Sequence, residues 1–345
     1  MPGPLGWRLL EMRGRVLLLI LLVLAGCAYF APRKAPGPPL TEAELRKGTQ
    51  GLAMSWIPGA PPATVYESAP DKPEEGLFEI AVELKNLGAS DIESGWLTLL
   101  YEPGRVLEIP GNDWKLDNIP TGMTERTISF SLEGRSLENP SGGRVLLSRT
   151  LKTGLLEPLS LQQTSSIGIV ACYDYTTLAS ATICIDPDPA GLRGITKTCK
   201  VADVSLTDQG APLAITKIEV AMLPRGLDAV LPELKVHIAN KGRGSVLNRE
   251  ALEAACRGVL PPDVELYNLL ELEGSLADLS FDCGAMPVRV REKEETVIRC
   301  VLERELRPSL AYPSPASFTA RYGYTQAISK SVTIVNNPAV AQRKV

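Results

Sequence analysis

Two stretches of this sequence align without a gap: Glu79-Ile-Ala-Val-Glu-Leu-Lys-Asn-Leu-Gly88 and Glu233-Leu-Lys-Val-His-Ile-Ala-Asn-Lys-Gly242. Four positions are identical, and apolar residues occupy alternate positions in both copies. A period of two is typical of a β-strand with one buried face. Each copy ends in Asn-x-Gly, which predicts a turn, because Asn can bond nearby backbone groups and Gly adopts positive φ freely.

A second pair of segments repeats in the same order, Ala171-Cys-Tyr-Asp-Tyr-Thr176 and Ala320-Arg-Tyr-Gly-Tyr-Thr325. The spacing from the Asn to the first Tyr is 87 residues in one copy and 82 in the other. Two motifs at nearly equal spacing predict two copies of one domain, over residues 66–190 and 200–338. The repeated Tyr pairs are interpreted as structural hydroxyls that satisfy backbone groups, rather than as a binding platform.

The rest of both copies is typical of antiparallel β-structure. Short β-prone runs alternate with clusters of Gly, Pro and Asn. These runs are Trp96–Tyr101, Glu125–Ser131, Ile167–Ala171, Ala181–Ile185, Val297–Leu302 and Ser331–Val335. The fold class predicted is therefore all-β, with two tandem immunoglobulin-like antiparallel β-sandwiches. A short helical insertion is expected in the second copy near 248–257, capped by Asn248 and ending near Gly258.

An alternating strand that ends in Asn-x-Gly, followed by a second strand and a closing strand with Tyr, resembles the CARDB-type immunoglobulin-like domains of prokaryotic membrane-anchored surface proteins. The matching stretches are Phe78–Gly88 with Trp96–Tyr101, and Leu234–Gly242. Tandem domains behind a tether are also similar to archaeal envelope proteins. The resemblance implies an immunoglobulin-like fold at a cell surface. The helical insertion, the larger domains and the cysteines depart from the simple CARDB pattern.

The N-terminus indicates export. Arg8, Arg13 and Arg15 precede the apolar run Val16–Leu24, so residues 1–31 are predicted to be a signal peptide or a membrane anchor. Leu24-Ala-Gly-Cys27 resembles a lipobox, which implies cleavage before Cys27 and lipid attachment to its sulfur. The alternative is an unmodified Cys27 at the end of a retained anchor. Both place the following chain outside the cytoplasm.

Residues 32–65 are rich in proline and are predicted to form a semi-rigid stalk. A short helix over Glu42–Lys47 is expected within it, because these are good helix formers placed before Gly48. As an alternative, the segment Gly51–Pro62 packs on the first domain.

The cysteines fit an oxidising compartment. Six follow Cys27, an even number: Cys172, Cys184, Cys199, Cys256, Cys283 and Cys300. Cys283 and Cys300 flank an expected hairpin that turns near 291–295, and Cys184 and Cys199 bracket the domain junction. Cys172 and Cys256 then remain by elimination. All fifteen pairings are open in principle. CxxC-type spacing is absent, which argues against a metal site.

No catalytic arrangement emerges from the sequence, so we predict no enzyme activity and no cofactor. The single His, His237, is expected to be an exposed strand residue. Acidic turns lie at Asp186–Pro189, Asn112-Asp113 and Asp117-Asn118; they are interpreted as turn chemistry rather than calcium ligands. Gly242-Arg-Gly244 lacks the further glycine and lysine of a phosphate loop.

The charge and composition of the chain limit the classes of partner that it could bind. The net charge is -4, which argues against nucleic acid. Residues 1–40 carry a net charge of +4, so the basic end is expected to meet the membrane. We therefore predict a membrane-tethered extracytoplasmic protein that displays two immunoglobulin-like domains to another protein or a surface polymer. The alternative is a ligand-binding lipoprotein associated with uptake or carbohydrate recognition.

Overall fold

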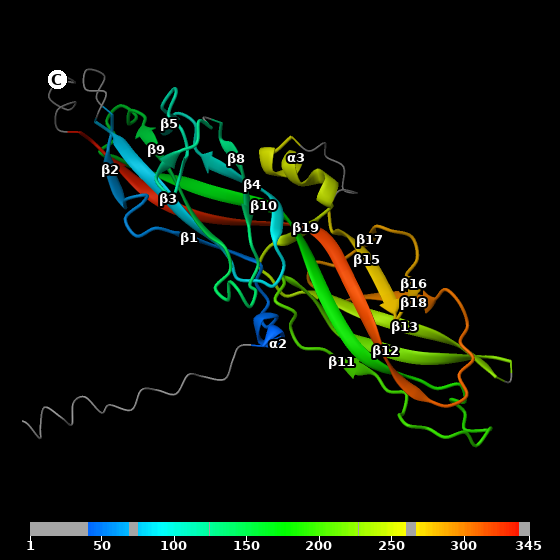
Figure 1. The fold of residues 1–345 in the computed structure, drawn as a ribbon. Coiled ribbons are helices and arrows are strands. Elements are labelled where there is room, and N and C mark those ends of the chain that lie inside the picture. Colours follow the sequence, from blue (N-terminus) through cyan, green and yellow to red (C-terminus); the bar gives the residue numbers. More distant parts are fainter. Residues whose placement is uncertain (1–40, 69–74, 124, 227, 260–266, 338–345) are drawn as a thin grey trace, which may run out of the picture. The chain divides into compact units, whose positions relative to one another are not determined.

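The computed structural model describes residues 41–68, 75–123, 125–226, 228–259 and 267–337. The predicted signal or anchor at 1–31, Cys27 within it, and residues 32–40 of the predicted stalk lie outside the described residues. From Glu42 onward the chain forms one compact unit, Glu42–Val345. That unit is built mainly of antiparallel strands, so the all-β prediction is confirmed (Figure 1).

All described strands of the first sheet come from the first predicted copy or from the segment just before it. Its order within the described residues is β1-β3-β9-β6-β7, and β5 also pairs with β9. The bounds are β1 (Leu52–Trp56), β3 (Leu77–Asn86), β5 (Val106–Glu108), β6 (Lys115–Leu116), β7 (Ile119–Pro120) and β9 (Arg144–Thr153). The alternating stretch that begins at Glu79 lies in β3, as predicted.

The second sheet contains strands from both predicted copies. Its order within the described chain is β11-β12-β13-β18-β16-β15-β19-β10-β4-β8, with β14 and β2 on β19 and β17 on β15. The bounds are β2 (Thr64–Tyr66), β4 (Ile92–Tyr101), β8 (Thr127–Leu132), β10 (Gln162–Ile185), β11 (Val204–Ser205), β12 (Leu213–Arg225), β13 (Ala229–Asn240), β14 (Ser245–Leu247), β15 (Leu269–Leu276), β16 (Leu279–Asp282), β17 (Val288–Arg289), β18 (Thr296–Leu302) and β19 (Tyr312–Val335). Five of the six predicted β-prone runs lie within these strands, and the sixth, Glu125–Ser131, begins two residues before β8.

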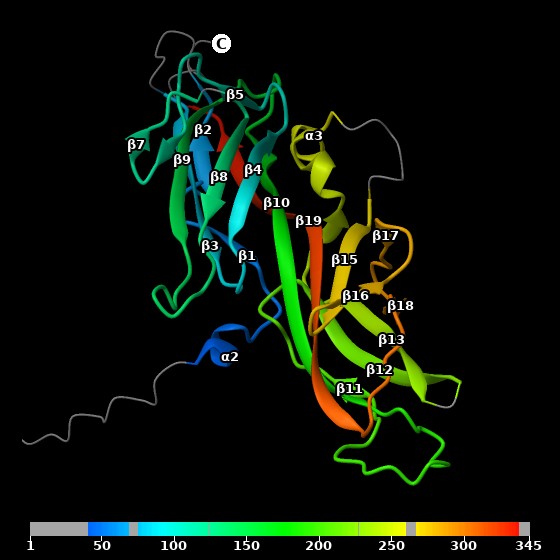
Figure 2. The same ribbon diagram turned by 45° about the vertical axis from the view of Figure 1, so that its right-hand side comes forward.

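Two long strands, β10 and β19, hold the sheet together. They pair antiparallel along their full length, from Gln162 opposite Val335 to Ile185 opposite Tyr312. The first half of β10 also pairs with β4, and the first half of β19 with β15. Figures 1 and 2 show the two strands side by side through the middle of the fold. Because each is the closing strand of one predicted copy, the copies meet in one sheet.

Buried apolar side chains form one continuous core through both halves. Leu84 and Leu147 of the first sheet and Leu97 and Ile169 of the second are fully buried in it. Val236 of β13 belongs to the same cluster. The boundaries at 66–190 and 200–338 remain a prediction.

The helical elements lie where the sequence placed them. The short helix α2 (Glu42–Leu45) falls within the expected Glu42–Lys47. Asn248 caps a 3₁₀ turn η1 (Arg249–Ala251) by accepting the Glu250 amide, and α3 (Leu252–Arg257) follows. Gly258 ends α3 in the left-handed conformation. The predicted insertion and its caps are therefore confirmed.

Two expectations are corrected. The stalk does not extend to residue 65, because β1 and β2 are paired strands whose Leu52 and Val65 side chains are buried; packing on the body, the alternative, is what the structure shows. The segment beside the turn near 291–295 also forms no hairpin with β18. β17 pairs with β15 instead, and β18 pairs with β16 and β13.

Candidate functional site

The repeated Asn-x-Gly and Tyr-x-Tyr motifs meet in the structure. Asn86 accepts the Gly88 amide at 3.1 Å and donates to the Ser90 carbonyl at 2.8 Å. Asn240 makes the same two bonds, to Gly242 at 3.1 Å and Gly244 at 2.8 Å. The bonds predicted for Asn are therefore confirmed in both copies.

The Tyr hydroxyls complete these two turns. Tyr175 donates to Asn86 Oδ1 at 3.3 Å, and Tyr324 donates to Asn240 Oδ1 at 3.0 Å. Tyr173 and Tyr322 accept the backbone amides that open β1 and β12. All four rings are buried, and burial raises the pKa of each phenol above its ordinary value. The structural interpretation of the Tyr pairs is thus confirmed, and they offer no binding surface.

The glycines of the two motifs have a different role from the predicted one. Neither Gly88 nor Gly242 has positive φ. A Cβ on Gly88 would lie 1.8 Å from the Tyr175 hydroxyl, and one on Gly242 would lie 2.2 Å from the Tyr324 hydroxyl. The absence of a side chain is therefore needed for the close approach of the tyrosines. The sequence signal for this arrangement was that an Asn-x-Gly motif and a Tyr-x-Tyr motif occur together, far apart along the chain, in both predicted copies.

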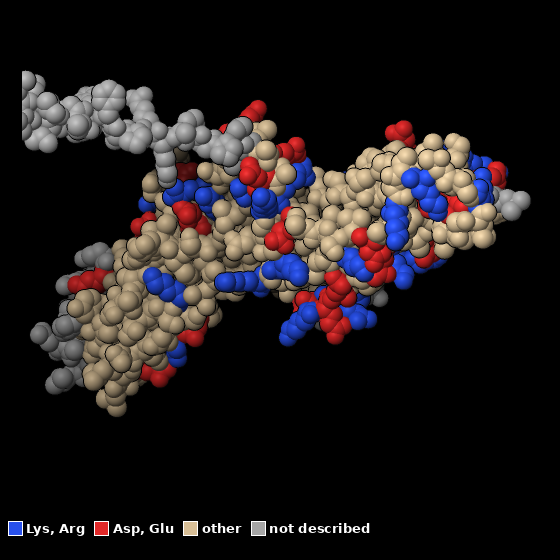
Figure 3. All heavy atoms as spheres, turned by 90° about the horizontal axis from the view of Figure 1, so that it is seen from below, with Lys and Arg blue, Asp and Glu red and all other residues tan. Residues whose placement is uncertain are grey.

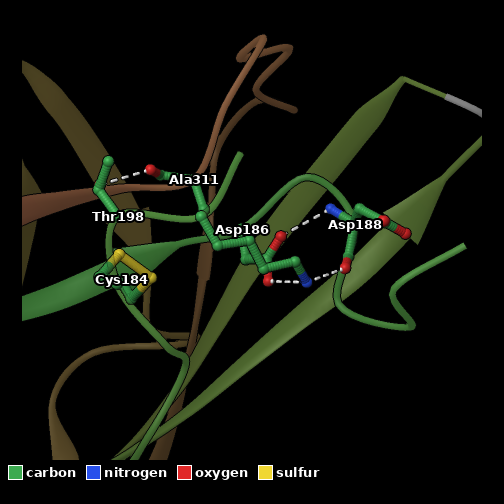
Figure 4. The surroundings of a disulfide bond; sticks show 7 residues. Cys184, Asp186, Asp188, Thr198 and Ala311 are labelled. Atoms are coloured by element: carbon green, nitrogen blue, oxygen red, sulfur yellow. Dashed lines mark hydrogen bonds and ion pairs between the residues drawn. A yellow bond between two sulfur atoms is a disulfide. The ribbon is translucent and has the colours of Figure 1, made fainter. Parts of the chain in front are cut away.

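The acidic turn at Asp186 and Asp188 is a closed structural loop (Figure 4). Lys197 Nζ bonds Asp186 Oδ2 at 2.7 Å, and the Asp188 carboxylate accepts the amides of Leu192 and Arg193, both at 2.8 Å. The disulfide Cys184–Cys199 closes the same segment. These carboxylates are already satisfied, so the interpretation as turn chemistry holds for this turn.

Asp188 gives the loop a pH dependence. Although burial opposes ionisation, the amides of Arg193 and Leu192 hold the pKa of Asp188 below its ordinary value of 3.8. Ionised Asp188 therefore favours folding above that value, and this contribution is lost as pH falls through the lower folded-state pKa.

Replacing Asp188 by Asn should lower the thermal unfolding midpoint at pH 7 and weaken its fall as the pH drops below 3.8. Circular dichroism melts over that range measure both effects. The matched control is Asp208→Asn, an exposed aspartate outside this loop. A variant with the unchanged pH profile of the native chain would show that Asp188 does not stabilise the loop.

A second of the three predicted acidic turns, Asp117-Asn118, links β6 to β7. Both residues have positive φ, and Asp117 accepts the Leu146 amide at 3.0 Å. Within the described residues, no group of three or more His, Cys, Asp or Glu side chains is placed to hold a metal ion.

His237 is not the exposed residue that strand alternation predicted. Its side chain is only 12% exposed and lies between two carboxylates, with Nδ1 2.8 Å from Glu295 and Nε2 3.2 Å from Glu219. Residues of neighbouring strands cover the outer face of β13, which strand periodicity alone does not reveal. This is an ionic cluster with no cleft.

An open sheet edge remains as the candidate site. β8 is the last strand of the long sheet. Its six residues make it longer than every other described strand that lies at the end of a sheet or on a side branch. Its sequence is Thr-Ile-Ser-Phe-Ser-Leu, without Pro, Lys or any other charge. Natural edge strands are usually protected by such residues, so this edge is unusually available for pairing.

The register shows which backbone groups β8 leaves unused. The Leu99 amide bonds the Arg126 carbonyl at 3.0 Å, and bonded positions in an antiparallel pair recur at every second residue. Ile128 and Phe130 therefore bond to β4, while the amide and carbonyl of Ser129 point away from it. β8 ends the sheet order among the described strands, so a further strand could pair with these groups.

A groove of about 580 Å³ lies beside the paired strands β4 and β8. β8 lines it along Ser129–Leu132, and the first sheet contributes Leu116, Asp117 and Arg144. Glu93 of β4 adds a second carboxylate. Charged groups of both signs thus surround a mostly uncharged strand, and an extended polypeptide fits this combination.

An ionic cluster fixes the entry to β8. Arg126 Nε lies 2.5 Å from Glu108 Oε1, and buried Arg149 reaches Glu108 Oε2 at 2.9 Å. The Tyr101 hydroxyl also donates to Glu108 at 2.5 Å. Burial and this bond raise the pKa of Tyr101 to about 12, and Glu108, despite burial, has a lowered pKa because these donors favour its charge. Arg149 further lies over the Trp114 ring.

The helix α3 braces the same end of the sheet. It packs on β4 and β10 (Figure 2). Thr98 of β4 bonds both Thr127 of β8 and the Cys256 carbonyl of α3, each at 2.8 Å. Arg257 of α3 pairs with Glu125 just before β8. These contacts hold β8 in a fixed position for pairing.

Comparisons with known proteins give no family. No protein-family model matches the sequence, and no curated protein matches it. Among solved structures, the search matched red sea bream transglutaminase, with 13% identity and a TM-score of 0.19. The alignment covers 86% of this chain and 32% of the transglutaminase, so this chain spans about a third of that protein's length. At this TM-score the likeness carries no argument about fold or activity.

No described helix has the length and apolar character to cross a membrane. Lys and Arg lie interspersed with Asp and Glu on the face drawn in Figure 3, so that face offers no continuous basic surface. Two predicted disulfides are present, Cys184–Cys199 and Cys283–Cys300.

Proposed function

We propose that this chain is a membrane-tethered, extracytoplasmic surface protein whose two immunoglobulin-like sandwiches, of the CARDB type, share β10 and β19. In this proposal it binds a partner protein by accepting an extended segment on the free edge of β8. The observation that carries the binding mode is the six-residue uncharged edge with its outward Ser129 backbone, set beside an open groove. Strand addition supplies affinity through main-chain bonds, and groove contacts add specificity.

Three features support the location. The sequence begins with a basic segment and an apolar run that ends in a lipobox-like Leu24–Cys27. Two disulfides suit an oxidising compartment. Residues 1–40 carry a net positive charge and the rest of the chain carries a net negative charge, which matches a membrane tether followed by an exposed body. The function is display for adhesion or assembly rather than catalysis.

The anchor is tested by intact mass of the full chain extracted from membranes. A mature chain that begins at lipid-modified Cys27, or an unprocessed chain with its apolar segment, is expected. Recovery of the full-length chain from the soluble cytoplasmic fraction, with every cysteine reduced, would refute the location.

Strand addition is tested with 12-residue peptides selected by phage display on the full chain. Ser129→Pro removes the outward amide while leaving the β4–β8 bonds, so peptide affinity should fall at least about tenfold. Ser129→Ala is the matched control, because it keeps the backbone and should bind within about twofold. Isothermal calorimetry measures both.

Circular dichroism melts accompany this comparison to confirm that Ser129→Pro folds. Hydrogen exchange of the β8 amides should slow when the peptide is bound. Equal affinity for the proline and alanine variants, in folded protein, would show that binding does not use the β8 edge.

A further inference from the structure

Two cysteines from distant parts of the chain meet beneath α3. Cys172 lies in the middle of β10, opposite Trp96 of β4 and opposite Thr325 of β19. Cys256 is in the last turn of α3. Their exposed fractions are 1% and 4%, and they share one small apolar cluster with Leu252. The fold, rather than sequence proximity, brings the two sulfur atoms together.

The two side chains pack in the same buried cluster. The hydrogen bond from Cys256 outweighs burial and lowers the pKa of Cys172, whereas the same contact and burial raise the pKa of Cys256. Cys256 Sγ also lies 3.1 Å from the Trp96 carbonyl, and Cys172 Sγ lies 3.6 Å from Thr325 Oγ1. With α3 docked, Cys172 is therefore the thiol of the pair with the lower pKa.

The remaining four cysteines of the described chain are already paired, as Cys184–Cys199 and Cys283–Cys300. We propose that Cys172 and Cys256 form a third disulfide in the mature protein, which joins α3 covalently to β10. This inference rests on the contact between the two residues and does not require the proposed partner.

The oxidant is an external disulfide, either of a thiol oxidoreductase or of glutathione. The Cys172 thiolate attacks one of its sulfurs, forms a mixed disulfide and releases the first external thiolate. Cys256 then loses its proton and attacks the Cys172 sulfur, which releases the second external thiolate. The two protein thiols lose two electrons and two protons, and the external disulfide is reduced to two thiols.

The burial of the two cysteines determines at which stage the thiol–disulfide exchange can take place. Leu252 packs against Gly323, where a Cβ would lie 2.6 Å from the leucine, so the docked helix leaves no room for an oxidant above β19. The mixed disulfide therefore forms while α3 is undocked, during folding or local opening. Once closed, the bond fixes α3 over β4, next to the Thr98–Thr127 contact that adjoins β8.

The test uses the full chain, refolded from the reduced state with glutathione disulfide. The protein is then denatured, alkylated and digested with trypsin and chymotrypsin, because cleavage after Tyr175 separates Cys172 from Cys184. Mass spectrometry should find one peptide that links Cys172 to Cys256, with neither residue alkylated. Complete alkylation of both, while the other two links are intact, would overturn the proposal, as would linkage of either residue to another cysteine.

Cys256→Ser is the matched control. It should leave Cys172 linked to no other cysteine of the chain, either alkylated or carrying glutathione from the first step, while the links Cys184–Cys199 and Cys283–Cys300 form as before. If Cys172 is instead linked to another cysteine of the chain in this variant, the proposal fails. Refolding with glutathione disulfide tests only whether Cys172 and Cys256 pair, whereas the intact mass of membrane extracts tests the proposed location. Failure of the disulfide proposal can therefore be told apart from failure of the proposed function.

Discussion

Replacing Gly88 by Ala is expected to lower the free energy of unfolding by about 3 kcal/mol, because an added methyl group has no room. Its Cβ would lie 1.8 Å from the Tyr175 hydroxyl and 2.4 Å from the Gly210 carbonyl oxygen. The tyrosine ring is buried and the second neighbour is backbone, so neither can move aside without loss of other contacts. Urea denaturation followed by circular dichroism measures the change.

Gly168→Ala is the control for this variant. Gly168 lies in β10 and, like Gly88, has no positive φ, but the nearest atom to its added Cβ would be 3.5 Å away, a normal contact. Its substitution should change stability by less than about 1 kcal/mol. The pair Gly88→Ala with Tyr175→Phe should cost less than the sum of its parts, because the clashing hydroxyl is gone. Equal effects of the two glycine substitutions would refute the close-approach explanation.

The second large effect is expected at Arg149. Its side chain is 1% exposed, pairs with Glu108 and lies over the Trp114 ring. Arg149→Ala leaves the Glu108 carboxylate without one of its donors and opens a cavity beside the indole. We expect a loss of about 3 kcal/mol in the free energy of unfolding, and Tyr101 and Arg126 keep the loss from being larger.

Arg144 on the same strand provides the matched control. Its side chain is 64% exposed and pairs with Glu83 at the surface. Arg144→Ala should cost at most about 0.5 kcal/mol, because solvent screens exposed pairs. Denaturant titration of both variants at one salt concentration separates buried from exposed pairing. A small effect at Arg149 would show that the cluster does not stabilise the entry to β8.

Local patterns in the sequence gave reliable predictions. Alternating residues identified β3 and β13, and the Asn248 cap with Gly258 marked the ends of the insertion. Two disulfides followed from spacing and position. Each of these depends on residues that are close in sequence or on a repeated motif, so one sequence carries enough information.

Features that depend on distant strands were missed. Strand alternation placed His237 at the surface, but Glu219 and Glu295 come from other parts of the chain and cover it. The prolines before residue 65 indicated a stalk, although Leu52 and Val65 are buried. β1 pairs with β3, and β2 pairs with β19 near the other end of the chain. The sequence also did not predict that β8 is an edge strand, because this depends on the order of all the strands in the sheet.

The shared pair of 24-residue strands has a consequence for any attempt to dissect the protein. Excising either half would leave one long strand without its neighbour along its whole length. The exposed backbone of such a fragment would be satisfied by a second molecule or by aggregation. Thermal unfolding of the intact body should accordingly be a single cooperative transition, with no stage at which one half survives alone.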